Sequence, residues 1–159
     1  MTPARSSEHK PTILSMPLDV AALFPHEDPY FVTIVAAFVP WVQTYGFALE
    51  VSKTRMGRPG FSLRFLIPGD KHVFGSFQFH DNRFLQFAWS KRKLRELGIE
   101  DQMKALLLVE LRALTSATGP SLITIDAYRL YLGPGDLRVV DTIKSKIDAI
   151  LKPAWEKRK

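Results

Sequence analysis

The amino-acid sequence predicts an α+β domain in which helices cover one face of an antiparallel β-sheet. Residues 28–46 place apolar side chains at alternating spacings of four and three, which is the period of one helical face. From residue 47 the period changes to two, with turns rich in Gly, Pro and Asp between the runs. Helical spacing returns after residue 90. Helices before and after a block of adjacent strands indicate α+β, in the order α-α-β-β-β-β-α-α-β-α.

The first part of the chain predicts a flexible arm followed by two helices. Residues 1–12 are polar and form the expected arm, and residues 13–159 form the expected single domain. Ser15 is the expected N-cap of a short helix. Asp28 followed by proline opens a second helix that ends near Gly46. Its β-branched residues and an internal proline leave a strand or a kinked helix as the alternative.

The alternating segment predicts a four-stranded antiparallel meander, and a fifth strand follows later in the chain. The expected strands are 47–52, 61–67, 71–80, 84–89 and 122–132. The fifth is expected in one or two pieces. Alternation gives the meander one apolar face, against which the helices pack, and one largely polar face.

The loop between the third and fourth strands allows a prediction of register. If residues 81–83 form the loop, His80 pairs with Phe84 and Gln78 pairs with Gln86. That register collects the apolar residues on one face, whereas a two-residue loop would pair polar residues with apolar ones. A three-residue loop is therefore expected.

Helix signals in the second half come from capping residues and breakers. Ser90 caps a short basic helix that Gly98 ends, and a longer helix spans residues 100–118. After a Gly-Pro-Gly turn, Asp136 caps the last helix and Pro153 ends it.

Composition limits the classes of function. The 159 residues are 46% apolar, which is enough for a hydrophobic core, and they include no cysteine. Disulfides, thiolate metal sites and a cysteine nucleophile are therefore excluded. Neither a signal peptide nor an apolar run long enough to span a membrane is visible, so we expect a cytoplasmic protein without membrane contact. No cofactor is implied.

The formal net charge of +6 favours an anionic partner, either nucleic acid or an acidic protein. The basic residues fall into three groups: Lys53, Arg55 and Arg58; Lys91, Arg92, Lys93 and Arg95; and Lys152, Lys157, Arg158 and Lys159 in an expected basic C-terminal tail. The first two groups are the candidate anion-binding residues. A solvated surface or a frayed end is the alternative interpretation of each group.

The polar face of the meander carries the candidate catalytic residues Glu50, Arg64 and His80. A carboxylate can orient an imidazole while an arginine holds an oxyanion, so this set could bind an anion or perform acid–base catalysis. A solvated sheet face with one surface ion pair is the alternative. The predicted register also places Phe84 beside His80, where a nucleic-acid base could stack on it.

Other catalytic and metal signatures are lacking. His72 and His80 are expected on one strand, about 26 Å apart, which is too far for one metal ion. A nuclease would need paired carboxylates and a lysine. Glu50 and Lys53 would point to opposite faces of a strand, and Asp70, beside Lys71, falls in a turn. Phosphate-binding loops and the serine nucleophile elbow are absent from the sequence.

Three functions follow from these patterns, in order of preference. The first is a binding or regulatory module with a basic surface that contacts nucleic acid. The second is a small enzyme with its site on the polar sheet face. The third is a protein–protein adaptor or homo-oligomer that buries Phe84 or Trp155.

Overall fold

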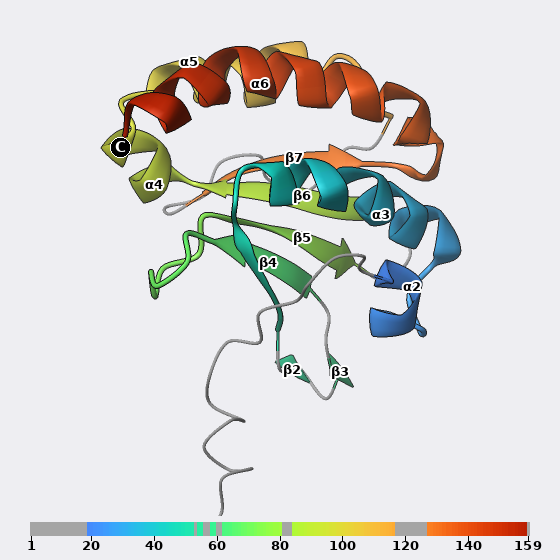
Figure 1. The fold of residues 1–159 in the computed structure, drawn as a ribbon. Helices are drawn as coiled ribbons and strands as arrows, with labels where there is room; N and C mark the ends of the chain where they lie inside the picture. The colour runs from blue at the N-terminus through green and yellow to red at the C-terminus, as the bar shows by residue number, and fades with distance from the viewer. Residues whose placement is uncertain are drawn as a thin grey trace, which may run out of the picture.

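The computed structural model describes residues 19–52, 54–55, 58–59, 62–80, 84–116 and 127–158. A five-stranded sheet lies beneath a layer of helices formed by α3, α5 and α6 (Figure 1). The elements are α2 (Val20–Leu23), α3 (Pro29–Thr44), β1 (Ala48–Val51), β2 (Thr54–Arg55), β3 (Arg58–Pro59), β4 (Ser62–Leu66), β5 (Gly75–His80), β6 (Phe84–Ser90), α4 (Lys91–Glu96), α5 (Glu100–Ala105), a π-helical segment (Leu106–Glu110), β7 (Ala127–Leu132), a 3-10 helix (Pro134–Val139) and α6 (Val140–Lys157). The predicted class and order are confirmed.

The main sheet has the strand order β1-β4-β5-β6-β7, and every neighbouring pair is antiparallel. The first four strands are the predicted meander, and the fifth strand joins the edge formed by β6. β2 and β3 form a separate two-stranded ribbon. His80 pairs with Phe84 and Gln78 with Gln86, which is the predicted register. Residues 81–83 themselves lie outside the described residues.

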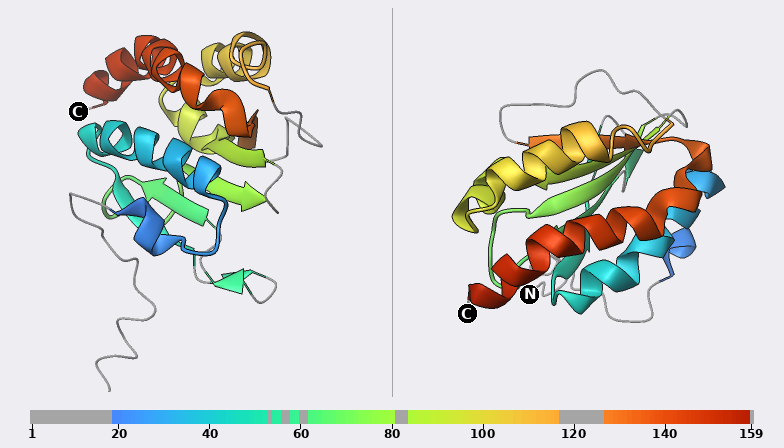
Figure 2. Two further views of the ribbon diagram at one scale, coloured as in Figure 1. Left: turned by 90° about the vertical axis from the view of Figure 1, so that its right-hand side faces the viewer. Right: turned by 90° about the horizontal axis from the view of Figure 1, so that it is seen from above.

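Helices cover the apolar face of the sheet, as the views from the side and from above show (Figure 2). The sheet contributes Phe65, Phe77, Phe87 and Trp89, each with at most 1% of its surface exposed. Phe38 of α3 contacts this layer, with ring centroids 5.4 Å from Phe77 and 5.0 Å from Phe87. Burying each such ring contributes roughly 1.5–3 kcal/mol to folding, so the aromatic layer fixes which face points inward.

The segment 28–46 is a helix rather than a strand. Asp28 Oδ1 accepts the Tyr30 N–H at 2.9 Å, which caps the first turn of α3. Gly46 has φ 85°, the conformation that ends a helix most readily at glycine. Pro40 lies inside the helix on its exposed side, so the predicted helix is continuous and the strand alternative is wrong.

The third strand is shorter than predicted. It begins at Gly75 rather than at residue 71, because Asp70 Oδ1 accepts the His72 N–H at 3.0 Å and bends the chain. His72 and His80 therefore do not share a strand, and the separation calculated for them does not apply.

The expected helix over 100–118 is interrupted. α5 ends at Ala105, and the next turn is π-helical, with the Leu111 N–H donating to the Leu106 carbonyl at 2.8 Å. The wider turn leaves Leu106, Leu107 and Leu111 all buried, as their predicted core positions require.

The last helix starts later and ends later than expected. Asp136 lies inside the 3-10 helix, where its buried carboxylate accepts the Gly133 N–H at 2.6 Å, and α6 starts only at Val140. Pro153 does not end α6. It lies on the exposed side, while the buried Leu151 and Trp155 hold the following turn against the core. The expected basic tail is thus helical as far as Lys157.

Several expectations fall on residues outside the described part of the chain. They concern the arm 1–12, the cap at Ser15, the side chains of Lys53, Arg55 and Arg58, residues 117–126 and Lys159. Within the described ranges, the helices lack the combination of length and apolar character that a membrane span requires.

Candidate functional site

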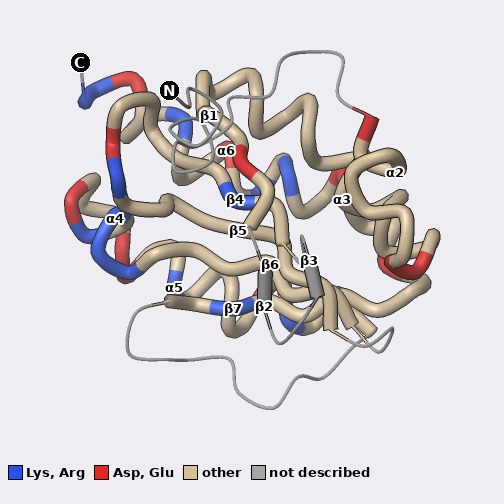
Figure 3. The backbone as a smooth tube through the Cα atoms, turned by 90° about the horizontal axis from the view of Figure 1, so that it is seen from below, with Lys and Arg blue, Asp and Glu red and all other residues tan. Residues whose placement is uncertain are grey.

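Basic residues of the described chain cluster around α4 and at the C-terminal end of α6, and others lie on β4, β7 and along α5 and α6. Figure 3 shows blue segments around α4 and at the C-terminal end of α6, and none on α3. The sequence of α3 contains no charged residue. α4 follows β6 without a loop, because Ser90 Oγ accepts the Lys93 N–H and starts the helix at the end of the strand. The basic side chains of α4 are thereby fixed at one end of the sheet.

Lys93 is the member of the α4 group that turns inward. Its side chain is 7% exposed, and its Nζ forms an ion pair with Asp70 and lies 3.3 Å from Glu96 Oε1. The hydrogen bond from Lys93 lowers the pKa of Asp70, so this pair stays ionised at neutral pH. Lys93 is therefore a structural ion-pair partner, and its predicted role in anion binding is not supported.

Arg95 and Lys91 belong to a network at the edge of α4. Arg95 donates to both carboxylate oxygens of Glu100, at 2.9 and 3.3 Å, and Glu100 also accepts the Tyr128 hydroxyl at 2.8 Å. The ammonium group of Lys91 lies 5.0 Å from the centre of the Tyr128 ring. Burial and the Glu100 hydrogen bond raise the pKa of Tyr128 to about 12, so its hydroxyl remains a donor. Part of the charge of Arg95 is neutralised within the protein.

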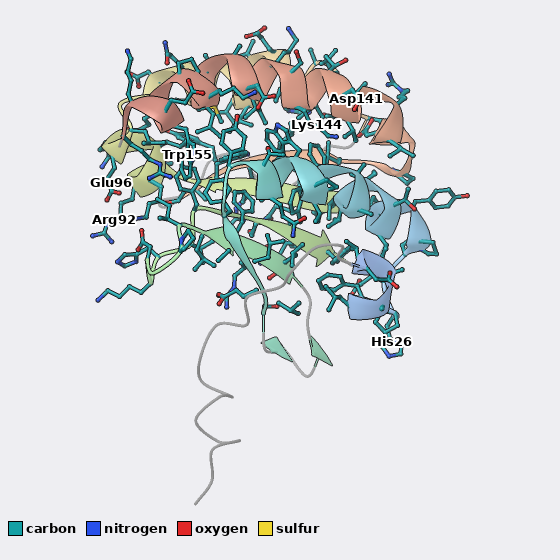
Figure 4. All side chains as sticks on the ribbon, in the orientation of Figure 1. His26, Arg92, Glu96, Asp141, Lys144 and Trp155 are labelled. Carbon is teal, nitrogen blue, oxygen red and sulfur yellow. The ribbon has the colours of Figure 1, made fainter. Side chains whose placement is uncertain are left out.

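Arg92 is highly exposed and only weakly paired. Its side chain is 65% exposed, its Nη1 lies 3.3 Å from His72 Nε2, and its Nε lies 3.7 Å from Glu96. Arg92 and Glu96 both project outward from α4, whereas Trp155 points inward from α6 (Figure 4). An ion pair at 3.7 Å between exposed groups is weak, so Arg92 remains available to an external anion.

These side chains line a recess of about 500 Å³, here called the basic pocket. Its cationic and imidazole groups come from His72, Lys91, Arg92 and Arg95, and its other lining residues include Gly75, Ser76, Ala88, Ser90 and Ala127. The volume lies within the range of small-molecule sites, and guanidinium groups bind phosphate or carboxylate oxygens with two parallel hydrogen bonds. The pocket is suited to an anion.

The polar face of the sheet adjoins this pocket through one cross-strand row, here called the open row. Strand pairing places Glu50, Arg64, Ser76, Ala88 and Arg129 side by side on five neighbouring strands. Arg64 Nη2 is 2.7 Å from Glu50 Oε1. Ser76 and Ala88 also line the basic pocket. The open row therefore extends from the pocket toward both edges of the sheet.

The other half of the polar face, here called the closed cluster, is paired within itself. Its members are Ser62, Gln78, His80, Phe84, Gln86 and Tyr131. Gln86 Nε2 donates to Gln78 Oε1 at 2.7 Å, and Gln86 Oε1 lies 3.2 Å from His80 Nε2. Gln86 is 3% exposed and Tyr131 1% exposed. The closed cluster is therefore a paired polar network in which Gln78 and His80 are partly exposed and the other members are buried.

Phe84 lies beside His80, as the register predicts, but it is not an exposed platform. It is 8% exposed, its ring stacks on His80 with centroids 4.9 Å apart, and Tyr131 packs edge-on at 4.8 Å. Its proposed role in stacking a base is therefore not supported.

The three candidate catalytic residues are only partly brought together. Glu50 and Arg64 form an ion pair in the open row, whereas His80 lies four residues along β5 from Ser76, or about 13 Å. His80 faces the closed cluster instead. The carboxylate therefore does not orient the imidazole, and the acid–base arrangement is not assembled.

The carboxylates considered for a nuclease are also engaged elsewhere. Glu50 pairs with Arg64, and Asp70 pairs with Lys93. Across the ranges that the structure describes, no group of three or more His, Asp or Glu side chains is positioned to hold a metal ion.

Trp155, expected at an intermolecular contact, packs inside the molecule. It is 6% exposed, and its indole N–H donates to the Tyr45 carbonyl at 3.0 Å. Its ring lies 4.7 Å from Phe47 and 5.7 Å from Phe74, so it belongs to the core. Both residues on which the adaptor hypothesis depended are therefore buried in this chain.

The sequence interpretation missed Arg129 and His72. Arg129 alternates with buried neighbours in β7, and this pattern could have assigned it to the polar face. The pairing of β7 with β6 is not visible in local patterns, because two helices separate these strands in the sequence. His72 was assigned to a strand, which concealed its place beside Arg92.

Comparison with protein-family models, with curated proteins and with solved structures finds no match for this chain.

Proposed function

We propose that this protein is a non-catalytic binding module that binds nucleic acid through the basic pocket. The observation that carries the proposal is the convergence of Lys91, Arg92 and Arg95 with His72 on one recess. Of these, Arg92 has only a weak ion pair and Lys91 contacts an aromatic ring rather than a carboxylate. Both cations can therefore pair with phosphates without first breaking a strong internal salt bridge.

Nucleic acid is favoured over an acidic protein by the shape and chemistry of the pocket. The recess is lined by the short residues Gly75, Ser76 and Ala88 as well as by the cations, so it offers room for a phosphate group on a flexible strand. Arginine matches the geometry of phosphate oxygens, and the net charge of +6 attracts a polyanion at long range.

The enzyme and adaptor alternatives have less support. His80 is separated from the Glu50–Arg64 ion pair, and Phe84 and Trp155 are buried. Neither arrangement offers a reactive group or an exposed apolar anchor comparable with the basic pocket.

The test is fluorescence anisotropy with single- and double-stranded DNA and RNA oligonucleotides over a salt series. We expect the logarithm of the observed binding constant to fall linearly with the logarithm of the salt concentration. The double variant Lys91→Gln, Arg92→Gln should bind more weakly and lower the slope by about 0.7 for each single-strand phosphate contact that is lost.

The matched control is Lys104→Gln, Lys152→Gln, which removes the same charge from exposed positions on α5 and α6. Equal losses in the two double variants would mean that net charge alone causes binding. No binding by the wild-type protein at low salt would contradict the proposed function.

A further inference from the structure

The open row holds two arginines whose Nε donors have no hydrogen-bond partner among the described residues. The Nε atoms of Arg64 and Arg129 are both buried without a hydrogen bond. Arg64 does bind Glu50 through Nη2, whereas no hydrogen bond or ion pair links Arg129 to any described residue. An unpaired buried donor is unfavourable, so two of them in one row require an explanation.

Residues with short side chains lie between the two arginines. Arg64 on β4 and Arg129 on β7 are separated by Ser76 and Ala88, one residue from each intervening strand. Three strand spacings place their Cα atoms about 14 Å apart. Ser76 and Ala88 have short side chains and also line the basic pocket, so the pocket meets the open row between the positions of the two arginines.

Three members of the open row are accessible to solvent, whereas Glu50 and Ala88 are each 7% exposed. The Arg64 side chain is 37% exposed, and Ser76 and Arg129 are partly exposed. In the adjacent closed cluster, Ser62 is 2% exposed and Gln86 3% exposed. Gln78 and His80 of the closed cluster are also partly exposed, so the unpaired Nε donors, and not accessibility, distinguish the open row.

We infer that the open row is a second phosphate-binding site, and that one nucleic-acid strand runs from the basic pocket across β5 and β6 between Arg64 and Arg129. This inference rests on the proposed function. An arginine can turn its Nε–H to a ligand by rotation about its terminal side-chain bonds, and Nε together with one Nη then grips a phosphate with two hydrogen bonds.

A single strand fits this site better than a duplex. The donors lie below the surface, so a phosphate must enter the recess to reach them, and a duplex with a persistence length of about 50 nm is too stiff to bend into it. The aromatic rings of this face, Phe84 and Tyr131, are buried in the closed cluster. Recognition therefore depends on phosphates rather than on stacked bases, and it is independent of sequence.

The experiment combines NMR with binding measurements on the full chain. The Nε–H signals of Arg64 and Arg129 are assigned from the variants Arg64→Gln and Arg129→Gln, each of which lacks one signal. The wild-type protein is then titrated with a single-stranded DNA oligonucleotide, with inorganic phosphate, and with a duplex. We expect the Arg129 signal, and that of Arg64, to shift with the single strand at lower concentration than with phosphate or duplex.

The same variants are measured by anisotropy. Arg129→Gln should weaken single-strand binding on the order of tenfold and reduce the salt slope by about 0.7. Arg129→Lys should recover only part of the affinity, since it keeps the charge but lacks the planar group with two donors. The control is Arg112→Gln, a partly exposed arginine of the segment after α5 that lines neither the basic pocket nor the open row.

The outcomes separate the two proposals. If the wild-type protein binds no nucleic acid, the proposed function fails. The second site alone fails under a different set of results. In that case the wild-type protein binds and the double variant Lys91→Gln, Arg92→Gln binds more weakly. The NMR signal of Arg129 does not shift, and Arg129→Gln binds with wild-type affinity. Preference for duplex over single strand would also overturn the inference.

Discussion

The two halves of the polar sheet face differ although the same alternation of residues produces them. In the closed cluster, Gln86 binds Gln78 and His80, the Phe84 ring stacks on His80, and Tyr131 packs edge-on against Phe84. In the open row, the guanidinium Nε atoms of Arg64 and Arg129 have no acceptor within the part of the chain that the structure describes, and the row adjoins a recess lined by basic residues. Polar groups that satisfy one another stabilise a fold, whereas groups left unsatisfied next to a recess are typical of a binding site.

The largest expected effect comes from breaking the closed cluster. Gln86→Ala removes the hydrogen bonds that this residue, which is 3% exposed, makes with Gln78 and His80. We expect the free energy of unfolding, measured by urea denaturation, to fall by about 1–3 kcal/mol, with nucleic-acid affinity unchanged. Ser76→Ala, in the open row, is the control and should change stability by less than about 0.5 kcal/mol. Equal effects of the two substitutions would abolish the distinction between the halves.

A smaller effect on folding stability is expected at acidic pH, where the ion pair between Asp70 and Lys93 of α4 is lost. The hydrogen bond from Lys93 lowers the pKa of Asp70 below its ordinary value of 3.8, so the folded state favours the ionised carboxylate. The contribution to stability is complete well above pH 3.8 and is lost as the pH falls through the lowered pKa. Wild-type protein should therefore lose more stability than Asp70→Asn between pH 6 and pH 3 on urea titration. Parallel pH profiles would show that the ion pair contributes nothing.

The smallest effect on stability is expected in the open row. Arg129→Met removes an unpaired buried donor and keeps a long apolar stem, so the free energy of unfolding should stay the same or rise by up to about 1 kcal/mol. Binding of single-stranded DNA should weaken in the same variant. A loss of more than about 1 kcal/mol in thermal or urea unfolding would show that Arg129 is a structural residue and not one reserved for a ligand.

Much of the fold was predictable because local patterns determine it. Caps at Asp28 and Ser90 and the pairing of His80 with Phe84 follow from neighbouring residues and are confirmed. The prediction that Pro153 ends the last helix is wrong. The helix continues because the packing of Trp155 against the core outweighs the local cost of proline.

The candidate site was less predictable, because it depends on contacts between distant segments. The basic group on α4 was identified from its sequence, but the inward turn of Lys93 depends on Asp70, 23 residues away. The place of Arg129 beside Ala88 depends on the pairing of β6 and β7 across two intervening helices. Charge clusters can be counted in a sequence, whereas the presence or absence of an acceptor for each cation requires the fold.

The most direct test of the account is photo-crosslinking of the wild-type protein to a single-stranded oligonucleotide that carries a photoreactive base, with the crosslinked peptides identified by mass spectrometry. The account predicts crosslinks in residues 72–76, 88–95 and 127–129, which supply the basic pocket and the open row, and their loss at high salt. Crosslinks confined to other surfaces, such as the uncharged α3, would contradict it.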